Sequence, residues 1–162
     1  MKKLFLIVFS LFTLITTGVA QKGMQGVGFN VGGNFGEDFV LGGGLKYQYN
    51  ISNYIRLEPS FNFYVLHGQY DSAFDLLGFL NFDVFFFAPR AFRPYFYAGP
   101  GFVSFSKHER FFGANAGFGL DYRLSHKLSL QVEVGAVKGF DTDADFDDKL
   151  AGKVNIGLSY NF

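Results

Sequence analysis

Apolar and polar residues alternate along most of this chain with a period of two. The clearest run lies between residues 150 and 162, where one face carries Leu150, Val154, Ile156, Leu158, Tyr160 and Phe162. The positions between them hold small or polar residues, namely Ala151, Lys153, Asn155, Gly157, Ser159 and Asn161. Successive side chains of a β-strand point to opposite faces, so this run predicts a strand with one apolar and one polar face.

Seven further segments continue this pattern and bring the number of predicted strands to eight. They are 25–35, 40–50, 54–65, 74–87, 93–105, 111–123 and 127–139. Each is long enough to cross a bilayer as a tilted strand, which takes about 9–11 residues. In 54–65, Tyr54 and Tyr64 share a face with Arg56 and Glu58, so we expect all four to lie on the polar side.

Two of these segments are less regular than the others. In 74–87 the face with the polar residues also carries several large apolar side chains. In 93–105 both faces are aromatic, and Pro94 and Pro100 interrupt the pattern. A proline inside a strand indicates a bulge or a bend. Alternation alone therefore leaves the outward face of 93–105 open.

The chain begins with the composition of a secretory signal peptide. Lys2 and Lys3 precede an apolar stretch from Leu4 to Ile15, and small residues follow it. This stretch is shorter than the roughly 20 apolar residues of a transmembrane helix. We expect cleavage after Ala20, so that 1–20 is a signal peptide and 21–162 a single domain.

The aromatic content of the chain indicates that this domain lies in a membrane. The 162 residues include 24 Phe, 9 Tyr and 21 Gly, and no Trp. A soluble domain of this size has no room to bury so many rings, and large apolar patches in water aggregate. Only helices and closed barrels span a bilayer, because backbone polar groups must be paired internally. We therefore predict an all-β fold, an eight-stranded antiparallel up-and-down transmembrane β-barrel.

Charge and cysteine content exclude several classes of function. Removal of Lys2 and Lys3 from the 14 basic residues leaves 12 in 21–162, against 14 acidic residues. This near-neutral balance gives no reason to expect a nucleic-acid partner. The chain has no cysteine, so it has no disulfide framework, thiol nucleophile or thiolate metal site.

An even number of strands returns the chain to its starting side, and we expect both ends to be periplasmic. The periplasmic turns are then 51–53, 88–92 and 124–126, and the outer loops are 36–39, 66–73, 106–110 and 141–148. Aromatic residues near the strand ends are expected to form girdles at the two membrane interfaces. These are Tyr49, Tyr122, Tyr160 and Phe162 on the periplasmic side and Phe35, Phe63, Phe112 and Phe140 on the outer side.

Together, the predicted signal, the alternating segments and the C-terminal Tyr160-Asn161-Phe162 resemble the small outer-membrane barrels of the OmpA/OmpX type. The resemblance covers the whole of 21–162 and implies a location in the outer membrane of a Gram-negative bacterium. Tyr160 and Phe162 are similar to the signal that the barrel-assembly machinery reads. The resemblance thus implies this machinery as a partner during biogenesis.

The predicted inward face carries charges of both signs. They are Lys46, Arg56, Glu58, Asp83, Asp121, Arg123, Glu133 and Lys153. We expect these charges to form a mutually neutralising network, because an isolated charge in a narrow lumen is costly. Mixed sign argues against an ion-selective ring. Eight strands leave a lumen that side chains can fill, although inward glycines such as Gly26, Gly28, Gly32, Gly42, Gly44, Gly117 and Gly119 could leave some water.

Catalysis would require a nucleophile, a histidine base and an orienting carboxylate. The resemblance to eight-stranded outer-membrane barrels admits an enzyme that modifies lipid A. The loosely matching clusters are His108 with Ser106 and Glu109, His67 with Asp71 and Ser72, and His126 with Ser129. The first two lie in loops, and the third lies at the periplasmic end, away from lipopolysaccharide. We therefore expect no catalytic site.

One loop is a weak candidate for divalent cations. Asp141, Asp143 and Asp145 match the start of an EF-hand loop. Phe146 stands where that loop needs its glycine, and Gly152 stands where it needs a bidentate glutamate. A solvated acidic loop is the alternative interpretation.

The expected function is a non-enzymatic structural or surface-interaction role in the cell envelope, with a largely plugged lumen and no cofactor. Alternatives are a narrow channel or small-ligand transporter and a lipid A-modifying enzyme. A soluble lipocalin-like barrel would need an apolar interior, the inverse of the predicted faces. We expect a monomer in contact with outer-membrane lipid and lipopolysaccharide, whose phosphates could pair with Lys138, Lys149, Lys107 or Arg110.

Overall fold

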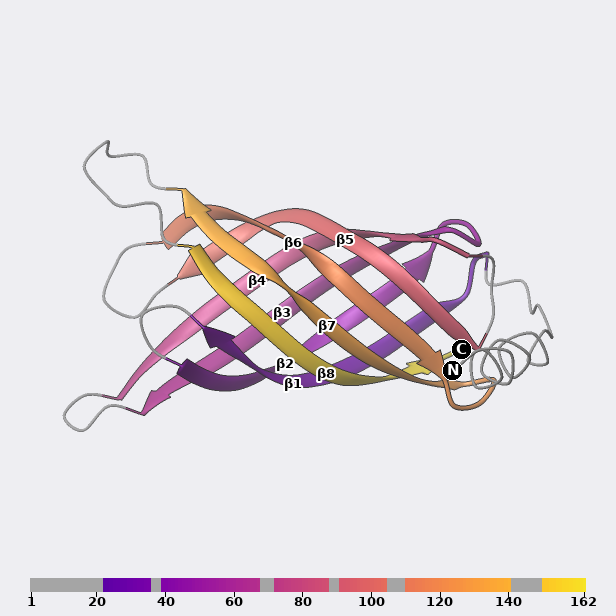
Figure 1. Ribbon diagram of the computed structural model, residues 1–162, viewed down its shortest axis with the longest axis horizontal. Helices are drawn as coiled ribbons and strands as arrows, with labels where there is room; N and C mark the ends of the chain where they lie inside the picture. The colour runs from indigo at the N-terminus through magenta and orange to yellow at the C-terminus, as the bar shows by residue number, and fades with distance from the viewer. Residues whose placement is uncertain (1–21, 36–38, 68–71, 88–90, 105–109, 141–149) are drawn as a thin grey trace, which may run out of the picture.

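The chain forms eight long strands that close into one antiparallel barrel (Figure 1). The computed structural model describes residues 22–35, 39–67, 72–87, 91–104, 110–140 and 150–162. The strands are β1 (Gln25–Phe35), β2 (Phe39–Asn50), β3 (Ile55–His67), β4 (Ser72–Phe85), β5 (Phe92–Ser104), β6 (Arg110–Arg123), β7 (Leu128–Phe140) and β8 (Leu150–Asn161). Each strand pairs with its neighbours in sequence, and β8 pairs with β1. Across these ranges, no helix is long and apolar enough to cross a membrane.

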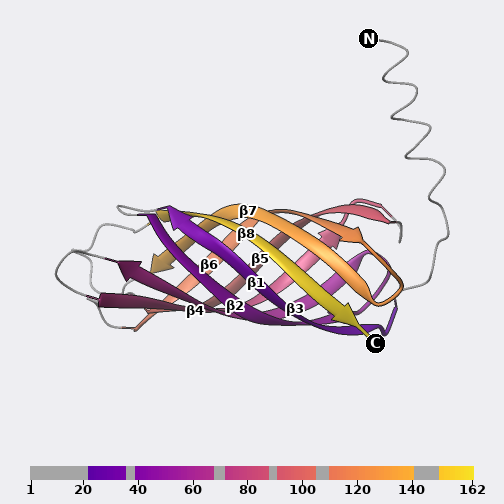
Figure 2. The same cartoon turned by 90° about the horizontal axis from the view of Figure 1, so that it is seen from below.

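Barrel closure is anchored at the last residue of the chain. The backbone N–H of Phe162 donates to the carbonyl of Gln25 at 2.8 Å, and Gln25 donates back to Phe162 at 3.2 Å. The register then continues through Val27 opposite Tyr160 and Phe29 opposite Leu158. In Figure 2, β8 lies beside β1 along this seam. A closed barrel leaves no unpaired strand edge in the bilayer, as spanning by strands requires.

Two of the turns at the end that holds the C-terminus are built alike. The hydroxyl of Ser52 accepts hydrogen bonds from the N–H groups of Tyr54 and Ile55, at 3.1 and 3.0 Å. The hydroxyl of Ser125 accepts from Lys127 and Leu128, at 3.3 and 3.1 Å. Serine side chains that pair with N–H groups two or three residues later stabilise a tight turn.

The strand boundaries agree with the alternation to within two residues, and the differences have physical causes. β4 ends at Phe85, where its pairing with Tyr95 ends, so Phe86 and Phe87 lie exposed in the turn. Tyr54, expected on the inner face, precedes β3 and is exposed in its turn. In both places the alternating sequence pattern extends beyond the last paired residue. Alternation depends on the residue types alone and therefore does not show where hydrogen bonding between the strands ends.

The two faces of the barrel have the polarity that the sequence predicted. The outward positions hold apolar side chains with large exposed fractions, such as Phe29 (53%), Leu45 (69%) and Phe118 (59%). All eight predicted girdle aromatics are exposed on this face. The structure also shows which face of β5 points outward, and this face carries Phe96 and Phe102. Its inward side carries Arg93, Tyr95, Tyr97 and Val103.

Candidate functional site in the lumen

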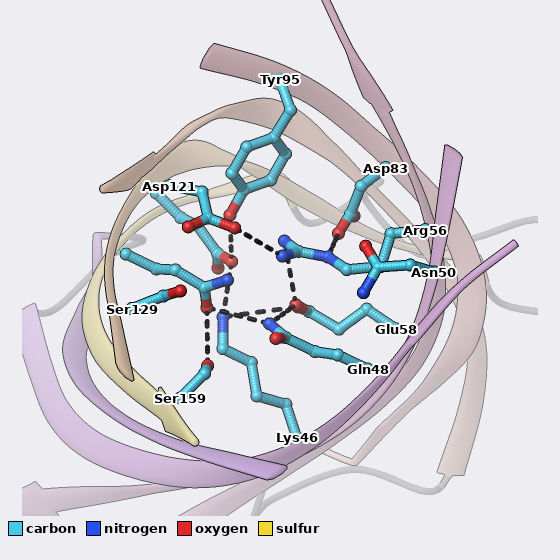
Figure 3. A network of polar contacts seen from close by, with 12 residues as sticks. Lys46, Gln48, Asn50, Arg56, Glu58, Asp83, Tyr95, Asp121, Ser129 and Ser159 are labelled. Carbon is cyan, nitrogen blue, oxygen red and sulfur yellow. Dashed lines mark hydrogen bonds and ion pairs between the residues drawn. The ribbon is translucent and has the colours of Figure 1, made fainter. Parts of the chain in front are cut away.

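Charged side chains of alternating sign form a continuous chain inside the barrel. Lys153 Nζ lies 3.9 Å from a carboxylate oxygen of Glu133, and Glu133 accepts a 2.8 Å hydrogen bond from Lys46. Lys46 also lies 3.5 Å from Glu58, and Glu58 lies 3.4 Å from Nη2 of Arg56 (Figure 3). Both glutamates therefore have cations on two sides.

Arg56 is the branching point of this chain. Its Nε donates to Asp83 at 2.6 Å, and its Nη1 donates to Asp121 at 2.9 Å (Figure 3). Asp121 accepts a second hydrogen bond of 2.9 Å from Arg93. The ring of Phe85 contacts both guanidinium groups, with its centroid 4.9 Å from Cζ of Arg56 and 4.0 Å from Cζ of Arg93. Cation–π contacts of this kind strengthen when water is excluded.

Neutral side chains use the remaining hydrogen-bonding capacity of the two glutamates. Gln48 donates through Nε2 to Glu58 at 2.7 Å and to Gln131 at 3.1 Å. The hydroxyl of Tyr95 donates to Glu133 at 2.8 Å. These contacts tie the ion pairs to polar residues of β2, β5 and β7, so the charges belong to one connected network.

The network balances its charges while excluding water. Its cations are Lys46, Arg56, Arg93 and Lys153, and its anions are Glu58, Asp83, Asp121 and Glu133. Their side chains are between 1% and 5% exposed. A buried charge is tolerated only with good partners, and loss of one partner leaves the other uncompensated. Each pair in the lumen therefore depends on its neighbours.

Every strand except β1 contributes a charge to this network. The inward residues of β1 are Gly26, Gly28, Asn30, Gly32 and Asn34. These small residues leave the centre of the lumen to longer side chains from the other strands. The Lys46 side chain, for example, places Cγ 3.2 Å from where a Cβ on Gly28 would lie.

An apolar layer closes the lumen toward the end away from the C-terminus. It consists of Val40, Tyr64, Leu77, Phe79, Val103 and Val137, which form one cluster of buried residues. Leu77 and Phe79 lie on the inner face of β4, at positions where the alternation is irregular. The mixed composition of that segment thus reflects a lumen that is polar at one level and apolar at another.

The expectation that inward glycines leave space for water is wrong at these positions. An added Cβ on Gly119 would meet Tyr95 Cζ at 2.2 Å, and one on Gly44 would meet Asn62 Oδ1 at 2.4 Å. The other five named glycines likewise have a neighbour within 2.7 Å of that point. Side chains of adjacent strands lie across the glycines, because only a residue without Cβ allows that approach.

The structure brings together seven of the eight predicted network residues, all except Arg123. Arg123 lies half-buried at the last position of β6, and its Nη2 has no hydrogen-bond partner in the described part of the chain. The end of β6 is open to the turn that follows, so this cation lies at the mouth of the lumen.

Arg93 is the network residue that the sequence analysis missed. It occupies the β5 segment whose faces the aromatic pattern did not separate. The register provides the missing information, because it pairs Arg93 with Asp121 and Tyr95 with Gly119. A charged residue just after the predicted turn 88–92 and opposite a predicted inward aspartate was the available signal.

The other candidate residues are placed as follows. Asp141, Asp143, Asp145, Ser106, His108 and Glu109 lie outside the described residues. The β3–β4 register sets His67 opposite Ser72. His126 lies exposed in the turn before β7, whereas Ser129 is buried and accepts a hydrogen bond from Asn161. Within the described ranges, no group of three or more His, Cys, Asp or Glu could hold a metal ion.

A closed barrel with an apolar exterior and a charged, buried interior is a membrane β-barrel and not a lipocalin-like soluble barrel. Residues 7–162 match the family described as outer membrane protein beta-barrel domain, and the chain belongs to this family. It is therefore an outer-membrane protein. A comparison with curated proteins found no match.

Solved structures of small outer-membrane barrels share this fold. The N-terminal β-barrel domain of Pseudomonas aeruginosa OprF superposes with a TM-score of 0.62 at 18% identity, covering 89% of this chain and 100% of that domain. Neisserial surface protein A superposes with a TM-score of 0.69 at 11% identity, covering 86% and 96%. The Yersinia pestis attachment invasion locus protein Ail gives 0.58 at 15%, covering 87% and 99%. At these identities the likeness establishes the fold alone.

Proposed function

We propose that this protein is a closed, non-catalytic structural barrel of the outer membrane, whose lumen does not conduct ions. The observation that carries the proposal is the burial of the lumen side chains at successive levels. Asp83 and Tyr95 in the charged part and Leu77 and Val103 in the apolar layer are each 0% exposed. A side chain with no accessible surface has no water-sized space beside it.

Two features of the lumen oppose the passage of ions. In the apolar layer, a hydrated ion would lose its water without gaining polar partners, which is costly. In the charged part, an ion would have to replace a partner such as Arg56, whose guanidinium already bonds Asp83 and Asp121. Separation of such a buried pair costs about 3–5 kcal/mol.

The experiment is a conductance measurement on purified barrels in planar bilayers, with a conducting porin as the control for detection. We expect no single-channel steps above those of the bare bilayer. Steady steps that change in Tyr97→Ala but persist in Phe96→Ala would establish a narrow channel through the lumen instead. Tyr97 points inward (1% exposed) and Phe96 points outward (36% exposed) from adjacent positions of β5. The two variants therefore distinguish conduction through the lumen from leakage along the outer surface of the barrel.

The absence of catalysis is part of the same proposal. We expect the lipid A mass spectrum of a strain that lacks this protein to equal that of its parent. A lipid A species that disappears on deletion and returns with the intact gene would instead support an enzyme. Variants of His108 and Ser106 would then test the outer-loop cluster.

A further inference from the structure

The lipid-facing surface of the barrel has one charged side chain among those that the structure describes. This residue is Lys138, at an outward position of β7 between Ala136 and Phe140. A cation on the lipid face of a membrane strand is unfavourable at the bilayer centre and tolerated near the interface. Lys138 lies two residues from the end of β7, close to the outer interface.

The side chain of Lys138 extends toward that interface. Its Nζ lies 5.6 Å from the ring centroid of Phe140, the last residue of β7. Phe140 in turn stacks on Phe112 of β6, with 6.3 Å between ring centroids. Long basic side chains take this course to place the ammonium among polar headgroups while the methylene stem stays in the apolar region. The charge is therefore held at the level of the lipid headgroups.

The positions on the β6 side of Lys138 are small, whereas Leu150 of β8 lies opposite it on the other side. The register sets Ala114 of β6 directly opposite Lys138. The next row toward the periplasm runs through Ala116, Ala136 and Gly152. Phe112 and Phe140 border these small residues on the outer side, and Phe118 and Val134 border them on the periplasmic side. A basic group thus stands beside a patch of small apolar residues in the outer half of the membrane.

We propose that Lys138, with Phe112 and Phe140 beside it, binds a phosphate group of lipid A in the outer leaflet. Charge complementarity selects this occupant, since lipid A carries phosphates at the level that the ammonium reaches. The row of Ala116, Ala136 and Gly152 receives an acyl chain of the same molecule. This site lies on the outer surface of the barrel and does not depend on whether the lumen conducts.

The test is a titration of the purified full barrel with lipid A, followed by native mass spectrometry. The probes are bisphosphorylated lipid A, the same lipid without phosphates, and phosphatidylglycerol. We expect Lys138→Gln to weaken binding of the bisphosphorylated form about tenfold, the effect of one charge-assisted hydrogen bond. Lys138→Arg should retain binding, and the lipid without phosphates should bind the wild-type and Lys138→Gln proteins equally.

Lys127 provides the matched control. Its Nζ lies 5.9 Å from the ring centroid of Tyr160, a similar lysine–aromatic contact at the opposite end of the barrel. Lys127→Gln should leave binding of lipid A unchanged. A second variant, Ala136→Phe, keeps the charge but fills the acyl area, and should also weaken binding. Equal binding by Lys138→Gln, an equal loss in Lys127→Gln, or equal competition by phosphatidylglycerol would each overturn the proposal.

Discussion

At the scale of single residues, the lumen is held together by buried ion pairs and by large side chains packed over glycines. Arg56 forms ion pairs with three carboxylates and is 1% exposed. Because its guanidinium does not reach water, solvent cannot replace a carboxylate that is removed. Large inward side chains such as Tyr95 lie directly across the glycines. Both arrangements predict that small changes inside the barrel have large effects.

Replacement of the central arginine should destabilise the barrel strongly. Arg56→Met leaves Asp83 and Asp121 without their shared cation, and we expect a loss of about 3–5 kcal/mol in the free energy of unfolding. Urea titration in lipid vesicles, followed by gel mobility, measures this loss. Lys127→Met, at an exposed turn position, is the control and should have little effect. Equal stabilities of the two variants would contradict the network's structural role.

Alanine should be tolerated at one strand glycine and not at another. A Cβ on Gly119 would lie 2.2 Å from Tyr95 Cζ, whereas the nearest atoms to a Cβ on Gly152 lie at 3.6 Å. We expect Gly119→Ala to cost about 1–3 kcal/mol by overpacking. Gly152→Ala should stay within about 0.5 kcal/mol of the wild type. The same urea titration measures both, and a reversed order would show that Tyr95 does not cover Gly119.

At the scale of elements, each strand carries two unrelated tasks on its two faces. β7 presents Val132 and Val134 to lipid while Gln131 and Glu133 join the lumen network. β1 is the exception, since its inward face is built of glycine and asparagine. The β1–β8 seam is therefore held by backbone hydrogen bonds and by small inward residues, without an ion pair from β1.

Paired cysteines should lock this seam if the register is correct. Phe29 and Leu158 lie directly opposite each other on the lipid face. Directly opposed residues have Cα atoms within about 5.5 Å, which suits a disulfide. We expect Phe29→Cys/Leu158→Cys to oxidise in the periplasm and to block heat-induced unfolding on gels until reduced. Phe29→Cys/Ile156→Cys, shifted by two residues, should remain reduced, and crosslinking of that pair would contradict the register.

The end of β8 should matter for assembly more than for packing. Phe162 is 61% exposed, so a charged residue there removes no buried contact. If Tyr160 and Phe162 form the signal for the assembly machinery, Phe162→Asp should lower the amount of protein in the outer membrane several-fold. Phe86→Asp, at a 54% exposed turn position, is the control. Equal membrane levels of the two variants would argue against the signal.

At the scale of the whole molecule, both the strand pairing and the packing of the lumen stabilise the closed barrel. Neighbouring strands pair all the way from β1 to β8 and back to β1, with short gaps in the register beside Pro59 and Pro100. The lumen is filled from the charged network to the apolar layer. Unfolding of such a barrel must break pairing and expose buried charges together. Resistance to detergent is the expected consequence.

Electrophoresis of unheated and heated membranes tests this closure. We expect an outer-membrane protein that migrates as a compact species when unheated and shifts to its unfolded mobility after boiling. The Arg56→Met variant should make this shift at a lower temperature, because it lacks the central cation of the network. A single mobility at every temperature would mean that the barrel is not closed by a cooperative set of contacts.

The sequence by itself determined the number of strands, their bounds to within two residues and, in every strand except β5, the polarity of their faces. These features depend on the residues within one strand, such as the alternation of Ile156, Leu158 and Tyr160 with polar neighbours. Local patterns therefore sufficed for the fold and for the membrane assignment. They also indicated the inward charges of every strand except β5, where Arg93 was missed.

Only the tertiary structure decided which of these inward residues meet. The pairing of Arg93 with Asp121, the position of Tyr95 over Gly119 and the location of Lys138 beside small residues all depend on the register between strands. Register follows from how all the strands close together, and no single strand encodes it. The chemistry of the lumen and of the lipid face is for this reason a property of the closed barrel.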